Sequence, residues 1–212
     1  MKYMSYYEEN GRITKNDYRR IEKTLQEEAP DKFERMLLRK MEFVNVEGYI
    51  SRDEELPCYY LCRKTKENHE EFLYLEKKNV QNGVVYKYCC TLTREECQAV
   101  MDGNIVWMQE HEHPLVRDLY RQMTINGLEL GGLKEYERKV YQSKKDSRIV
   151  FDERIQRIIG KHVTLFEEEG MRVDCLFGHQ VHISYRRDKT IPRMIANMVQ
   201  NQEQVSEDFA FA

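Results

Sequence analysis

Four stretches of the sequence each place a basic residue on the same expected strand face as an aromatic or apolar one. Side chains alternate across a β-strand, so residues two apart share a face. Lys and Arg on such a face can hold an anion such as phosphate, Arg bidentately and Lys as a point charge. The pattern equally fits strands with one face in water, and alternation alone does not separate the two. The sets are Tyr74, Glu76 and Lys78; Val85, Lys87 and Cys89; Tyr136 and Arg138; and Arg148, Val150 and Asp152.

Two other groups of residues could bind a metal, and both have simpler interpretations. His111 and His113 are two positions apart just before Pro114, which is typical of a solvated loop. The six cysteines include no Cys-x-x-Cys pair, so we expect reduced thiols in a cytoplasmic protein rather than a zinc site or disulfides.

The composition predicts a soluble globular protein. Its 212 residues fit one domain over residues 1–200, followed by a polar tail over 201–212. With 34 basic and 37 acidic residues the net charge is −3, which argues against a nucleic-acid partner. There is no apolar run long enough for a transmembrane helix, and the first residues do not resemble a signal peptide.

Strands joined by short turns, with helices interspersed, predict an α+β domain around an antiparallel sheet. The clearest unit is a hairpin, residues 72–78 and 84–90, whose Asn82-Gly83 pair suits a tight turn. Capping patterns predict helices that begin at Thr14 and Thr93. The remaining expected elements are strands over 41–50, 58–62, 133–141, 147–151, 171–177 and 179–185, and helices over 114–126 and from 190.

From about Leu56 to Val199 the order and spacing of these segments resemble a known family. The segments are Phe72-Leu-Tyr-Leu-Glu-Lys-Lys78, Asn82-Gly-Val-Val-Tyr-Lys87, Leu92-Thr-Arg-Glu-Glu96, Tyr136-Glu-Arg-Lys-Val-Tyr141, Arg148-Ile-Val-Phe-Asp-Glu-Arg-Ile155 and His182-Ile-Ser-Tyr185 with Ile191-Pro192. They are similar to the vacuolar transporter chaperone (VTC) domain of polyphosphate polymerases, in the CYTH-like superfamily of triphosphate tunnel metalloenzymes.

The resemblance implies an antiparallel β-barrel with helices at its ends, enclosing a basic tunnel. It implies ATP, polyphosphate or another triphosphate as ligand, a divalent metal (Mn or Mg), and phosphoryl transfer that depends mainly on positioned charges. By position, the phosphate-binding residues would be Arg63, Lys78, Lys87, Arg138 and Arg148. Of these, Lys78, Arg138 and Arg148 would be catalytic, and Glu76 would bind the metal.

The sequence departs from the family pattern at several positions. Residues 3–7 lack the alternating charges of the family's first strand, and Leu61 replaces the first of two paired arginines. His182 and Ser184 occupy the positions of a metal-binding Glu and a Lys. Because hard divalent ions prefer carboxylate oxygen, we interpret His182 as a tunnel side chain without its metal.

Three functions remain open from the sequence. The first is a polyphosphate polymerase, the second is a catalytically degraded domain that binds polyphosphate, a nucleotide or a protein partner, and the third is a triphosphatase.

Overall fold

The computed structural model describes residues 2–28, 33–45, 57–142, 148–160, 162–167, 169–176, 180–186 and 195. The described strands are β1 (Lys2–Thr14), β2 (Phe33–Asn45), β3 (Cys58–Lys66), β4 (Glu71–Gln81), β5 (Val84–Thr91), β6 (Leu128–Gln142), β7 (Arg148–Ile159), β8 (Met171–Asp174) and β9 (Gln180–Arg186). The described helices are α1 (Lys15–Glu28), α2 (Arg94–Met101), the 3₁₀ helix η2 (Val106–Glu110) and α3 (Pro114–Ile125).

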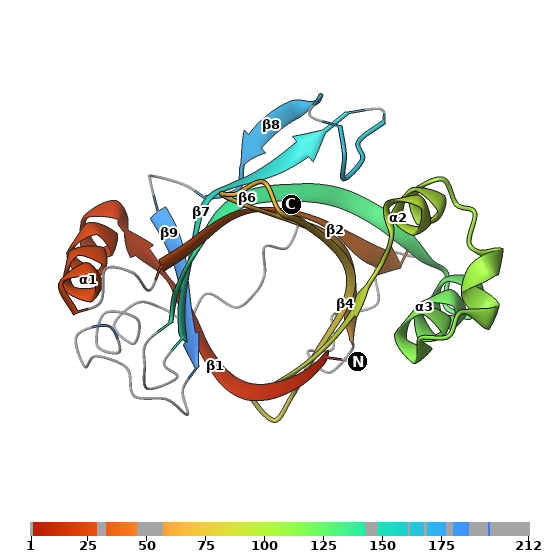
Figure 1. The fold of residues 1–212 in the computed structure, drawn as a ribbon, viewed down its shortest axis with the longest axis horizontal. Helices are drawn as coiled ribbons and strands as arrows, with labels where there is room; N and C mark the ends of the chain where they lie inside the picture. The colour runs from red at the N-terminus through yellow and green to blue at the C-terminus, as the bar shows by residue number, and fades with distance from the viewer. Residues whose placement is uncertain are drawn as a thin grey trace.

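The sheet closes into a barrel. Its strand order is β6-β2-β3-β4-β5-β1-β9-β7, and β7 pairs back with β6 to complete a ring (Figure 1). Every pairing is antiparallel. Strand β8 pairs with the end of β7 and lies outside the ring. The predicted α+β antiparallel barrel is confirmed.

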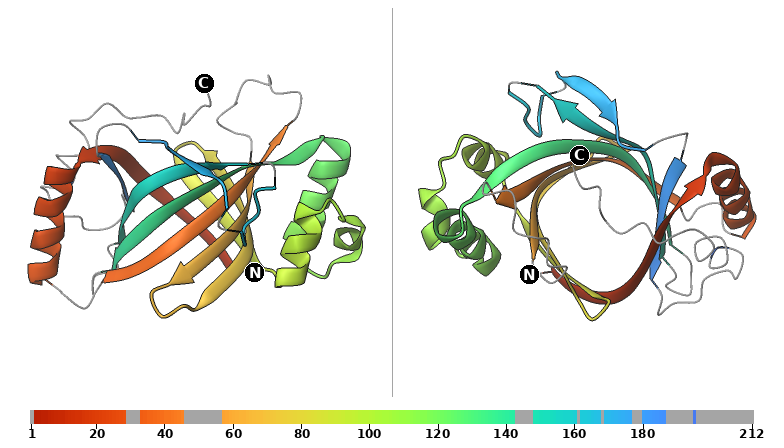
Figure 2. Two further views of the ribbon diagram at one scale, coloured as in Figure 1. Left: turned by 90° about the horizontal axis from the view of Figure 1, so that it is seen from above. Right: turned by 180° about the vertical axis from the view of Figure 1, so that it is seen from behind.

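The helices lie outside the ring, and their contacts identify the outer face of each strand (Figures 1 and 2). Leu61 and Leu75 are buried in a cluster with Val116 and Leu119 of α3. On the other side, α1 packs against the outer faces of β7 and β9, in a cluster that includes Ile21, Leu25, Ile149, Phe151, Val181 and Ile183. Because side chains alternate along a strand, the neighbours of these apolar residues point into the barrel.

Local sequence signals account for the turns and helix starts. Asn82 and Gly83 have φ of 51° and 73°, the left-handed conformation that a two-residue hairpin turn requires. The Thr93 hydroxyl accepts a hydrogen bond from the Glu96 backbone N–H, and the Glu96 carboxylate accepts one from the Thr93 N–H, which completes the predicted capping box.

Several strands are longer than their sequences indicated, and in β1 and β2 the added length changes the inner wall. Strand β1 continues past Tyr7 to Thr14, so the charged residues Glu8 and Arg12 also point inward, and the expectation of an uncharged first strand is corrected. Strand β2 begins at Phe33, inside a segment whose charges had not suggested a strand. The inner face of the barrel mixes charged side chains with buried apolar ones such as Leu38 and Val150, which obscures the usual pattern of a buried strand.

Some predicted features lie outside the described residues. These are the tail over 201–212 and most of the helix expected from residue 190, of which Ile195 alone is described. Within the described ranges, no helix has both the length and the apolar character needed to cross a bilayer.

Candidate functional site

Glu76 forms a charged group on the inner wall with two lysines. Its side chain, on β4, is 3% exposed. One carboxylate oxygen lies 2.8 Å from Lys40 Nζ of β2, and the other accepts from Lys87 Nζ of β5. Burial opposes the charge on Glu76, but the two ammonium groups outweigh this effect and hold its pKa well below the usual range. The Lys40 ammonium also lies 3.6 Å from the centre of the Tyr60 ring.

A second ion pair joins β6 and β7. Arg138 Nε and Nη2 each lie 2.7 Å from an oxygen of Asp152, a bidentate arrangement. Burial disfavours the charge on Arg138, yet Asp152 raises its pKa well above the ordinary value. His182 of β9 lies opposite Asp152, with Nδ1 3.9 Å from Oδ2.

Arg148 is a cation for which the described part of the chain supplies no ion-pair partner, although the Glu8 carboxylate acts on it at longer range. Its side chain forms no ion pair or hydrogen bond with any residue that the structure describes. Burial lowers its pKa, and the positive charges of Arg138 and Arg186 lower it further. The pairing of Ile149 with Tyr185 brings Arg148 and Arg186 side by side at the ends of β7 and β9. The Arg186 guanidinium stacks 4.7 Å from the Tyr6 ring centre.

A second like-charged pair lies on the hairpin. Lys78 and Lys87 occupy directly opposite positions of β4 and β5. Like charges at such positions repel, so the pair destabilises the strands unless anions lie nearby. Glu76 contacts Lys87, and Glu8 lies 3.7 Å from Lys78.

Most of the site residues predicted from sequence come together. Lys78, Lys87, Arg138 and Arg148 all point into the barrel, as do Glu76 and His182. The side chains of Lys78, Lys87 and Arg138 keep 18%, 21% and 22% of their surface exposed, so solvent reaches the interior.

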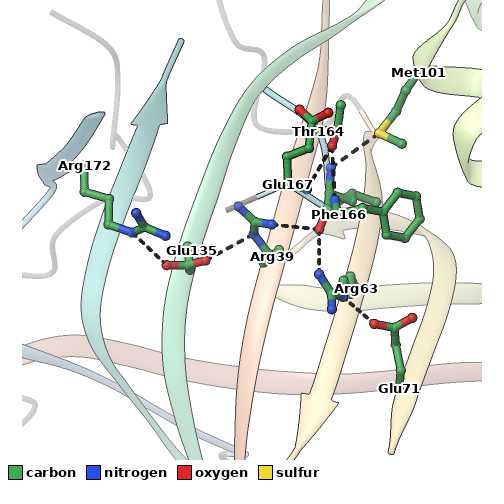
Figure 3. A network of polar contacts seen from close by, with 10 residues as sticks. Arg39, Arg63, Glu71, Met101, Glu135, Thr164, Phe166, Glu167 and Arg172 are labelled. Atoms are coloured by element: carbon green, nitrogen blue, oxygen red, sulfur yellow. Dashed lines mark hydrogen bonds and ion pairs between the residues drawn. The ribbon is translucent and has the colours of Figure 1, made fainter. Parts of the chain in front are cut away.

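Arg63 is the exception, and its predicted position is corrected. It shares the outer face of β3 with buried Leu61, which packs under the helices. Its guanidinium bonds to Glu71 and, together with Arg39, donates to the Leu165 carbonyl oxygen (Figure 3). Cys62 and Lys64 point inward instead. Arg63 therefore holds residues 164–166 against the outside of the barrel.

Replacing Arg63 with Gln is expected to reduce stability modestly without affecting the barrel interior. Two charged hydrogen bonds at a part-exposed position correspond to a loss of about 1–2 kcal/mol. Chemical denaturation measures this loss. The affinity for any ligand of the inner wall should stay within about twofold of the wild type. Such a small difference in binding free energy is less than the loss of a direct contact would cause. A large loss of such affinity would mean that the outer face binds the ligand.

Sequence reasoning missed Lys40, Arg186 and Glu8. Lys40 lies in a strand whose first half was not recognised, and Glu8 in the unrecognised end of β1. Arg186 is two residues beyond Ser184 and four beyond His182, so alternation along β9 would have found it.

Glu76 and Asp152, the two most buried carboxylates of the inner wall, do not fit a divalent metal. Mn²⁺ and Mg²⁺ prefer several free carboxylate oxygens. Here both oxygens of Glu76 face lysines, and both oxygens of Asp152 face Arg138. Among the described residues no group of three His, Cys, Asp or Glu side chains could hold a metal ion.

Solved structures share this barrel. A candidate adenylate cyclase from Bacillus halodurans aligns with a TM-score of 0.59 at 13% identity, covering 99% of this chain and 97% of its own. A candidate adenylyl cyclase from Hippeastrum, described as having a dominant triphosphatase activity, gives 0.57 at 14% identity and covers 98% and 94%. A chain of the Schizosaccharomyces pombe Mediator head module gives 0.52 at 12%, covering 93% and 90%. At these identities the likeness shows the fold alone.

Sequence comparisons identify the family. No curated protein matches the chain significantly. The family model of the VTC domain matches residues 58–207, which include β3 to β9 and most of the inner-wall cations. With its triphosphate-tunnel type of barrel, this chain belongs to the VTC domain family.

Proposed function

We propose that the chain binds a triphosphate or a longer phosphate chain on the inner wall of the barrel. The observation that carries the proposal is Arg148, a part-buried guanidinium beside Arg138 and Arg186 with no carboxylate partner among the described residues. A like-charged group held away from bulk water is stabilised by an anion placed between its members. Guanidinium groups bind phosphate oxygens bidentately, which makes phosphate a suitable anion.

A chain of phosphates suits the site better than a single one. Tyr6 lies within electrostatic range of both Arg148 and Lys78, and also of Glu8 and Glu76. The arginine group and the hairpin lysines are therefore neighbours on one wall. Several linked phosphates can satisfy cations that are spread along such a wall, whereas one phosphate satisfies fewer of them. Membership of the VTC domain family supports the same ligand class.

Binding, rather than metal-dependent phosphoryl transfer, is the function that this geometry supports best. Transfer in such sites depends on a metal to neutralise the developing charge on the phosphates. Glu76 and Asp152 are each engaged by cations on both oxygens, so neither is free for that role. We therefore propose a domain that holds ATP, tripolyphosphate or polyphosphate, acting in the cytoplasm as its six free thiols suggest.

Calorimetric titration of the protein with tripolyphosphate, in EDTA and again with Mn²⁺, tests this function. We expect saturable binding to one site in EDTA, with no consumption of ligand. Absence of binding in both conditions would contradict the proposal.

Product analysis in the same experiment separates binding from catalysis. Release of phosphate with Mn²⁺ would favour a triphosphatase, the activity described for the Hippeastrum protein of similar fold. Growth of polyphosphate from ATP would favour a polymerase. Either product would overturn the assignment to binding alone.

A further inference from the structure

The Glu76 carboxylate occupies the position that a bound phosphate oxygen would take. Its two oxygens are divided between Lys40 and Lys87, which approach from strands on opposite sides of β4. The group is almost fully buried at Glu76, while the lysines stay partly exposed. The lysines therefore face the interior with their charge already compensated by a residue of the same chain.

We propose that Glu76 is an internal counter-anion that competes with the phosphate ligand for Lys40 and Lys87, and that binding needs no metal. This inference rests on the proposed function. It assigns Glu76 a role opposite to that of a metal ligand, because a metal-binding carboxylate would strengthen phosphate binding and a counter-anion weakens it.

The surroundings of the two lysines support this role. Lys40 is held over the Tyr60 ring as well as against Glu76, so its ammonium has a fixed position. Lys87 contacts Glu76 and lies directly opposite Lys78 on the neighbouring strand. A phosphate chain that reaches Lys78 is thus one strand away from Lys87, and it can attract that ammonium away from the carboxylate.

The competition also sets a charge threshold for the ligand. A carboxylate carries one negative charge, and its hydrogen bonds to two ammonium groups must be replaced. An anion with several charges can do this, whereas a weakly charged one cannot. We therefore expect selection of triphosphate and longer chains over inorganic phosphate.

The test is the substitution Glu76→Gln, which keeps the shape and removes the charge. In EDTA we expect tripolyphosphate to bind about tenfold tighter than to the wild type, since two cations lose their internal partner. The preference for tripolyphosphate over inorganic phosphate should shrink. Glu71→Gln is the matched control, because Glu71 pairs with Arg63 on the outer face and its loss changes the net charge equally. Glu71→Gln should leave the affinity for tripolyphosphate within about twofold of the wild type, because solvent and salt screen a charge on the outer face from the ligand.

Unchanged or weaker binding by Glu76→Gln in EDTA would overturn the inference. Weakening seen with Mn²⁺ alone would restore Glu76 as a metal ligand. Failure of the wild type to bind in either condition would instead remove the proposed function itself, so the two failures are distinguishable.

A second comparison keeps the test decisive if buried lysines without a carboxylate prevent folding. The second comparison uses two variants, Lys40→Met alone and Lys40→Met combined with Glu76→Gln. In both variants Lys87 is the one lysine left beside residue 76, so fewer buried positive charges lack a partner. Adding Glu76→Gln to Lys40→Met should tighten tripolyphosphate binding about threefold, through Lys87 alone. No tightening in this background would also overturn the inference.

Discussion

Replacing Arg148 with Gln is expected to weaken tripolyphosphate binding by about 100-fold, in the range found when one partner of a close charge pair is removed. The ligand-free protein should be as stable as the wild type, or slightly more stable. Arg148 has no ion pair to lose among the described residues, and its removal relieves repulsion with Arg138 and Arg186. Titration calorimetry measures the affinity, and urea denaturation without ligand measures the stability.

Arg63→Gln is the matched control for this substitution, since it removes the same charge from the outer face of the barrel. The two variants should behave in opposite ways. Arg148→Gln loses the ligand and keeps its stability, while Arg63→Gln keeps the ligand and loses some stability. Equal affinities for the two variants would mean that Arg148 does not contact the phosphates.

The substitution Ile149→Ala, one residue further along β7, is expected to lower the free energy of unfolding by about 2–5 kcal/mol. Ile149 is fully buried on the outer face, in the cluster that α1 forms with β7 and β9. Removing its side chain leaves a cavity between the helix and the barrel. Urea denaturation monitored by circular dichroism measures the loss.

Ile159→Ala supplies the comparison on the same strand, because Ile159 is 44% exposed. Its cost should stay within about 0.5 kcal/mol, as for other exposed positions. Similar costs at positions 149 and 159 would show that α1 does not cover β7 as described. The neighbours Arg148 and Ile149 thus test the two faces of one strand, the first for binding and the second for stability.

Local signals in the sequence were sufficient to predict much of the fold. The Asn82-Gly83 turn fixed the hairpin, and the Thr93 capping box fixed the start of α2, because both depend on a few adjacent residues. Alternation also placed Lys78 and Arg138 on the same face as Tyr74 and Tyr136, and Lys87 on the same face as Val85, since the period of two is set by strand geometry alone.

The rest of the site depends on contacts between distant strands. Lys40 and Glu76 are 36 residues apart and meet because β3 lies between β2 and β4. Arg63 was misplaced because it was assigned through the resemblance to the family's paired arginines, whereas in this chain it shares the outer face of β3 with Leu61. Its guanidinium donates to the Leu165 carbonyl oxygen, a partner 102 residues away. No local pattern specifies either contact.

The metal was implied by the resemblance to the family, which matched Glu76 to an acidic residue by its position in the strand. The proposed function omits the metal because of contacts that a single position does not show. Two lysines from neighbouring strands change that interpretation, because they satisfy both oxygens of the carboxylate.

Determination of the structure with tripolyphosphate in EDTA tests the central claim most directly. The account predicts phosphates inside the ring of strands, in contact with Arg148 and Arg186, with Lys87 turned from Glu76 toward the ligand. Phosphates on the outer face near Arg39 and Arg63, or bound through a metal ion at Glu76 when Mn²⁺ replaces EDTA, would contradict it.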